Sequence, residues 1–80
     1  MKTYRAFEIK YVSATDRTGA RVSIKDSRFD RKKIIPYNYE FNNIYQIAES
    51  YLSGIGIVCI GVSETPNGYV LFTDNFTIQI

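Results

Sequence analysis

With 80 residues, 45% of them apolar, and with seven Tyr and five Phe, the chain fits one small globular domain (1–80) and is too apolar for a disordered segment. It has no His and a single Cys, which excludes the usual imidazole base, an internal disulfide and zinc sites built on paired thiolates. No apolar run approaches the roughly 20 residues that cross a bilayer, and residues 1–10 lack the apolar core of a signal peptide. We therefore expect a cytoplasmic protein without a membrane partner.

The charges are segregated along the chain. All ten Lys and Arg lie within residues 1–33, where four acids leave a net charge of +6; the rest of the chain has four acids and no base, a net charge of −4. A basic segment of this density raises the affinity for phosphates or for an acidic protein surface. We expect a functional basic face, with an ordinary solvated face as the alternative.

Two strands are predicted in the basic segment. Residues 3–12, "TYRAFEIKYV", alternate apolar and polar side chains, which is typical of a strand with one buried face. Residues 20–27, "ARVSIKDS", alternate again and place Arg21 and Lys25 on the outer face. The connecting loop "SATDRTG" is rich in hydroxyl groups and can present backbone amides together with Arg17 to a phosphate or a carboxylate. Ordinary turn chemistry is the alternative for that loop.

A third strand and one helix follow. The strand "KKIIPY", residues 32–37, should end at Pro36 or lie at a sheet edge, because proline has no amide hydrogen to donate to a ladder. Asn42 or Asn43 can cap the helix, and Gly54 stands where a C-terminal glycine is expected. The apolar face of this helix recurs at helical spacing through Ile44, Ile47, Ala48, Tyr51 and Leu52.

Two more strands are predicted near 57–63 and 69–73, joined by a tight hairpin at Asn67-Gly68. The run "GIVCIGV" is apolar on both faces, with Cys59 as a buried small hydrophobe, so a single short helix leaves its second face uncovered. Closure of the sheet into a partial barrel, a homodimer or a target protein could cover that face. Residues 76–80, "FTIQI", extend this hairpin or add a last short strand.

The order strand–strand–strand–helix–strand–strand predicts an α+β fold with a small, mainly antiparallel sheet and one helix packed on one face. Catalysis is not expected, nor a cofactor or a metal site. The acids that could meet in space, Glu8 with Asp16 or Asp26 with Asp30, each lie near a base in sequence, which favours solvated ion pairs over an acid–base pair.

The residues expected to bind a partner are the Arg and Lys side chains of the second strand, its flanking loop and the following turn. Three tyrosines could also stack on nucleobases, or could be ordinary core and rim residues. These candidates are Arg17, Arg21, Lys25, Arg28, Arg31, Lys32, Lys33, Tyr4, Tyr37 and Tyr39.

One sequence pattern resembles a known group of proteins. "KYVSATDRTGARVSIKD", followed by "IIPYNYEF", is similar to a pattern in small uncharacterised proteins of phages and plasmids. The resemblance covers residues 10–41 and implies a mobile-element protein that acts by binding, as anti-CRISPR inhibitors of host defence do.

The sequence therefore favours a non-catalytic, stoichiometric inhibitor of a host defence ribonucleoprotein, with a CRISPR effector as one candidate target. The alternative is a small RNA-binding or single-stranded DNA-binding protein that acts directly on nucleic acid. We expect the basic half to make the contact, although the acidic half could instead occupy a positively charged nucleic-acid channel. A homodimer is also expected, because the chain is short and one apolar face needs cover.

Overall fold

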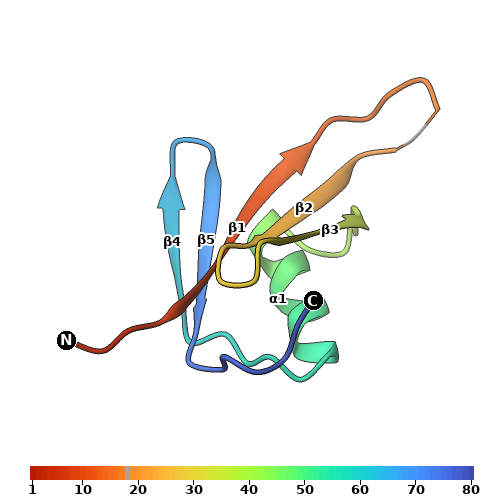
Figure 1. Cartoon of the computed structure of the whole chain (residues 1–80). Helices are drawn as coiled ribbons and strands as arrows, with labels where there is room; N and C mark the ends of the chain where they lie inside the picture. The colour runs from red at the N-terminus through yellow and green to blue at the C-terminus, as the bar shows by residue number, and fades with distance from the viewer. Residues whose placement is uncertain (18) are drawn as a thin grey trace.

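A computed structural model describes residues 1–17 and 19–80 and contains a five-stranded antiparallel sheet with one helix against it (Figure 1). The elements in chain order are β1 (Arg5–Val12), β2 (Arg21–Asp26), β3 (Arg31–Pro36), α1 (Ile44–Gly54), β4 (Gly61–Thr65) and β5 (Gly68–Thr73). The strands lie in the order β3-β2-β1-β5-β4, which confirms the predicted α+β fold. Residues 76–80 add no strand; Ile78 and Ile80 pack against the core instead. No helix of the described residues is long and apolar enough to span a membrane.

The core lies between one face of the sheet and the helix. Alternation places Phe7 and Ile9 of β1 on this face, and both are fully buried. The remaining core residues are Val22, Ile24, Ile35, Ile47, Ala48, Leu52, Ile57 and Leu71. Burying each large aliphatic side chain contributes about 1.5–3 kcal/mol, so this single layer carries most of the stability of the domain. Among the described residues, no helix covers the opposite face of the sheet (Figure 1).

Both ends of α1 are capped by groups from the chain itself. The Asn43 side chain accepts from the Tyr45 amide at the N-terminus and donates to the Tyr69 hydroxyl, which joins the cap to β5. At the C-terminus, Gly56 and Ile57 donate to the carbonyls of the last turn, and Gly56 has a φ of 96°. The helix ends at Gly54, as the sequence predicted, and Gly56 takes the left-handed position that follows.

The apolar run after the helix differs from its prediction. β4 begins at Gly61 instead of near residue 57, and it lies at the edge of the sheet with β5 on one side. Ile57 is buried under the helix end, but Val58 is 67% exposed, Ile60 is 51% exposed and Cys59 is half-buried. The apolar run predicted a longer strand, near 57–63, because an apolar pattern alone does not show where strand pairing begins.

The β4–β5 hairpin turns at residues 66–67, so Gly68 is the first residue of β5 and not a turn residue. Gly68 has a φ of 152°, and a Cβ there would overlap the backbone carbonyl of Ile9 on β1. Glycine at this position therefore lets β5 approach the central strand.

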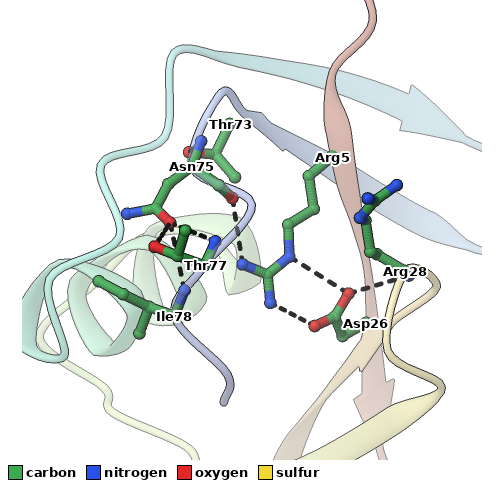
Figure 2. A network of polar contacts seen from close by, with 7 residues as sticks. All are labelled: Arg5, Asp26, Arg28, Thr73, Asn75, Thr77 and Ile78. Carbon is green, nitrogen blue, oxygen red and sulfur yellow. Dashed lines mark hydrogen bonds and ion pairs between the residues drawn. The ribbon is translucent and has the colours of Figure 1, made fainter.

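A buried ion pair joins β1 to the end of β2. The guanidinium of Arg5 donates through Nε and Nη2 to the carboxylate of Asp26, and both side chains are fully buried (Figure 2). The Arg5 Cζ atom also lies 4.8 Å from the ring centroids of both Phe7 and Phe29. The expectation of a solvated ion pair at Asp26 is wrong, because the pair is fully buried and the partner is Arg5, 21 positions earlier in the chain.

The same arginine holds the segment that follows β5. Arg5 Nη1 donates to the Asn75 carbonyl at 3.1 Å, and the Asn75 side chain accepts from the amides of Thr77 and Ile78 (Figure 2). These bonds fold the chain after Thr73 back toward the core, which the partly buried Ile78 contacts.

Candidate nucleic-acid interface

The sheet face opposite α1 is called the open face here. Strand alternation and the cross-strand register bring four cations together on it, one from β1, two from β2 and one from β3. We name these the basic patch: Lys10, Arg21, Lys25 and Lys32. Three of them were predicted binding residues; Lys10 was not, although its alternation with Phe7 and Ile9 already placed it on the outer side of the first strand.

Like charges face each other inside the basic patch. Lys25 of β2 is the direct cross-strand partner of Lys32 on β3, and both are exposed. Glu8 of β1 lies opposite Lys25 on the other side. Among the described residues, no salt bridge joins any member of the patch to an acid within 4.0 Å. The patch therefore keeps most of its positive charge, although adjacent like charges on a sheet are destabilising.

The middle of the patch is largely closed to water. Ser23 sits at an open-face position between Arg21 and Lys25, opposite Lys10 and Ile34, yet it is 4% exposed. Long basic side chains cover a sheet surface with their methylene stems while the charged ends reach solvent. The charged groups therefore lie above a part of the sheet surface that water barely reaches.

Arg21 reaches one end of the open face, beside Pro36 of β3. Its Nε atom is buried and has no hydrogen-bond partner among the described residues. A hollow of about 560 Å³ lies there, lined by Gly19, Ala20, Arg21, Ile34, Ile35, Pro36, Tyr37 and Tyr39. An anion that occupied this hollow, such as a phosphate, would lie beside the Arg21 side chain.

The other predicted bases do not join the patch. Arg31 and Lys33 alternate with Lys32 and therefore lie on the helix side of the edge strand β3, where both are exposed. Arg28 lies in the β2–β3 turn, with its guanidinium 4.9 Å from the Phe76 ring centroid. Arg17 is exposed in the β1–β2 loop. Thr18, one of the predicted loop hydroxyl residues, lies outside the described residues.

The predicted tyrosines are divided between two places. Tyr37 packs on the core and contacts Tyr11 and Tyr39, with ring centroids 5.9 Å and 4.8 Å away. Tyr39 is 82% exposed. Tyr4 lies apart from them, beside Phe72 of β5 at the end of the open face away from Arg21. The β1–β5 pairing, which spans most of the chain, places Phe72 on the open face.

The lone cysteine lies elsewhere, between α1 and the segment before β4. Cys59, Val58 and Glu49 line a hollow of about 450 Å³ together with Phe41, Gln46, Ser50 and Ser53. Burial, and secondly the negative charge of Glu49, raise the pKa of Cys59 to about 11. The thiol is therefore neutral at physiological pH and is a poor nucleophile.

A scan against protein-family models and searches of curated proteins and of solved structures find no match to this chain.

Proposed function

We propose that this chain is a non-catalytic binding protein whose basic patch recognises the phosphate backbone of nucleic acid within a ribonucleoprotein. One observation carries the proposal: Lys25 faces Lys32 across an uncovered sheet face and neither forms a salt bridge within the described residues. This arrangement weakens the sheet, and a polyanion would offset the repulsion.

The shape of the surface also favours a phosphate backbone. The basic patch is distributed over three adjacent strands. Lys25 and Lys32 lie roughly 5 Å apart across the sheet, Arg21 and Lys25 lie roughly 13 Å apart along β2, and Lys10 lies roughly 8 Å from each of these two β2 residues. A point ligand would need these charges to converge on one centre. A chain of phosphates instead meets them in succession.

The resemblance to phage and plasmid proteins supports a host defence complex, of the kind that anti-CRISPR proteins inhibit, as the source of that nucleic acid. Binding to its guide RNA or to the displaced strand would compete with the contacts that such a complex makes to its nucleic acid. Direct action on free nucleic acid, the alternative, uses the same patch.

Fluorescence anisotropy with labelled single-stranded RNA, single-stranded DNA and duplex DNA between about 50 and 300 mM salt tests the patch. Each lost phosphate contact flattens the log–log salt slope by about 0.7–0.9, so Lys25→Ala/Lys32→Ala should flatten it by about 1.4 or more. Arg31→Ala/Lys33→Ala removes the same net charge from the opposite side and is the matched control. Equal slopes for the two double variants would contradict the proposal, as would absence of binding to every probe at 50 mM salt.

A ribonucleoprotein target gives a second readout. The wild type and both double variants are used as bait in lysate of a bacterium that carries a defence system, and the captured RNA is sequenced. We expect wild type and Arg31→Ala/Lys33→Ala to enrich one guide-like RNA, and Lys25→Ala/Lys32→Ala to lose it. Protein captured without RNA, and equally by all baits, would instead assign the function to another surface.

A second copy of the chain remains part of the proposal. β4 is an edge strand without Lys or Pro, and it exposes Val62, whereas the other edge, β3, carries three consecutive bases and ends at Pro36. Bases and proline on an edge prevent strand pairing, so β4 is the edge that can pair with another copy. Light scattering at about 100 μM should report a dimer, and Val62→Lys should return it to a monomer; a monomeric wild type would refute this.

A further inference from the structure

An apolar hollow lies on the open face, at the end away from Arg21. It measures about 340 Å³ and is lined by Tyr4, Ile60, Gly61 and Phe72. Tyr4 is 42% exposed, and the Lys2 ammonium lies 5.5 Å from its ring centroid. The hollow therefore combines aromatic surface with a nearby cation, and it shares the sheet face with the basic patch.

The Phe72 ring is flanked by the smallest side chains of the sheet. Its cross-strand neighbours are Ala6 on β1 and Gly61 on β4. A Cβ at Gly61 would meet the ring at 3.8 Å, so glycine leaves that side of Phe72 open. Larger residues at these two positions would cover the ring. The sequence therefore leaves room for a flat group beside Phe72.

The hollow and the basic patch are close enough for one ligand. Phe72 of β5 and Lys25 of β2 lie on opposite sides of β1, two strands apart. Their partners on β1 are Ala6 and Glu8, which are two residues apart along the strand. Strand spacing and rise place the Cα atoms of Phe72 and Lys25 roughly 12 Å apart. A strand of about four nucleotides or more can therefore contact both.

We propose that the nucleic acid bound by the open face is single-stranded, with one unpaired base stacked in the hollow of Tyr4 and Phe72 while the backbone follows the basic patch. This inference depends on the proposed function. In a duplex the bases are stacked on one another and face inward, so they cannot reach an aromatic pocket on a flat sheet.

The chemistry of the hollow also predicts little base preference. Among the four residues that line the hollow, Tyr4 is the one whose side chain can form a hydrogen bond, through its hydroxyl group. Stacking alone accepts any base, because each base has an aromatic face. We therefore expect the open face to select single-stranded over duplex nucleic acid and to show little preference for base sequence.

Anisotropy with three labelled eight-nucleotide probes tests the inference: oligo-dT, the same backbone with abasic sites throughout, and a duplex. The abasic probe keeps the phosphates and removes the bases. Wild type should bind oligo-dT roughly 5- to 100-fold more tightly than the abasic probe, in the range measured for a stacked base. Oligo-U compared with oligo-dU shows whether the 2′-hydroxyl contributes, because these two probes differ in that group alone, and equal affinity for the two is expected.

Tyr4→Ala should remove this difference and leave the salt slope unchanged, because it deletes stacking and no phosphate contact. Phe72→Leu should do the same with little change in volume, and it serves if Tyr4→Ala perturbs folding. Val58→Ala, which shortens an exposed apolar side chain outside both the hollow and the basic patch, is the control. If wild type binds all three probes equally with a steep salt slope, the stacking inference is overturned and the proposed function stands. If wild type binds none, both are overturned.

Discussion

Replacing Asp26 with Asn tests how much of the fold depends on the buried ion pair. The substitution keeps the shape of the side chain but removes the charge that faces Arg5, and both side chains are fully buried. Arg5 would keep its bond to the Asn75 carbonyl, which cannot neutralise a guanidinium. Leaving one member of a buried pair without its partner costs about 3–5 kcal/mol.

That loss is large relative to the stability of an 80-residue domain, which is about 4–12 kcal/mol. Urea denaturation followed by circular dichroism should show a lower midpoint, by about 3 M if the urea dependence is about 1 kcal/mol per M. The melting temperature should fall by at least about 12 °C. Arg5→Met/Asp26→Leu, which removes both charges, should recover at least half of the lost stability, because paired apolar replacements are often tolerated.

Asp30→Asn is the matched control. Asp30 is exposed and has a φ of 52°, a conformation that asparagine accepts readily. The control should change the free energy of unfolding by less than about 0.5 kcal/mol. The reasoning would be refuted if Asp26→Asn moved the urea midpoint no further than Asp30→Asn does, or if the double variant were less stable than Asp26→Asn alone.

Three further predictions concern single positions. Gly68→Ala should destabilise the domain by at least about 1–3 kcal/mol, because its Cβ would overlap a backbone carbonyl of β1; a calorimetric melting temperature equal to that of wild type would disprove this. Lys32→Glu should raise stability by about 0.2–1 kcal/mol, because it faces Lys25, and should weaken nucleic-acid binding; urea titration and anisotropy on the same sample check both effects, and a loss of stability would count against the reasoning. Alkylation of Cys59 by iodoacetamide at pH 8 should be about 100-fold slower than that of a free thiol, because the raised pKa keeps the thiol protonated, and the rate should increase up to about pH 11. Glu49→Gln should lower that pKa and speed the reaction, whereas a wild-type rate equal to that of a free thiol would contradict the raised pKa.

The sequence predicted what depends on local periodicity. Alternation in the first two strands placed Phe7 and Ile9 inside and Arg21 and Lys25 outside, and the register confirms these faces. The spacing of apolar residues likewise located the helix and its buried side. These patterns need no knowledge of distant neighbours, because each is a property of one element.

The sequence could not predict what depends on pairing between distant elements. Arg5 looked like one more surface base, yet it is buried because Asp26 and two aromatic rings surround it in the fold. The open-face position of Phe72 follows from pairing with β1, more than sixty positions earlier, and not from a local pattern. The basic patch was therefore partly predicted, and the hollow beside it was not.

The position of β1 at the centre of the sheet has a consequence for how the chain reaches its folded state on the ribosome. Of these five strands β1 is synthesised before the others, and β2 and β3 can pair beside it soon afterwards through short connections. Its other edge stays unpaired until β5 has emerged, because Arg5 pairs with Thr73. In the earlier part of that interval, until α1 has emerged, Phe7 and Ile9 also lack the cover of the helix. The nascent chain thus exposes a half-finished sheet with an unprotected central strand, a state open to chaperone binding and to aggregation, and the late hairpin of β4 and β5 ends it.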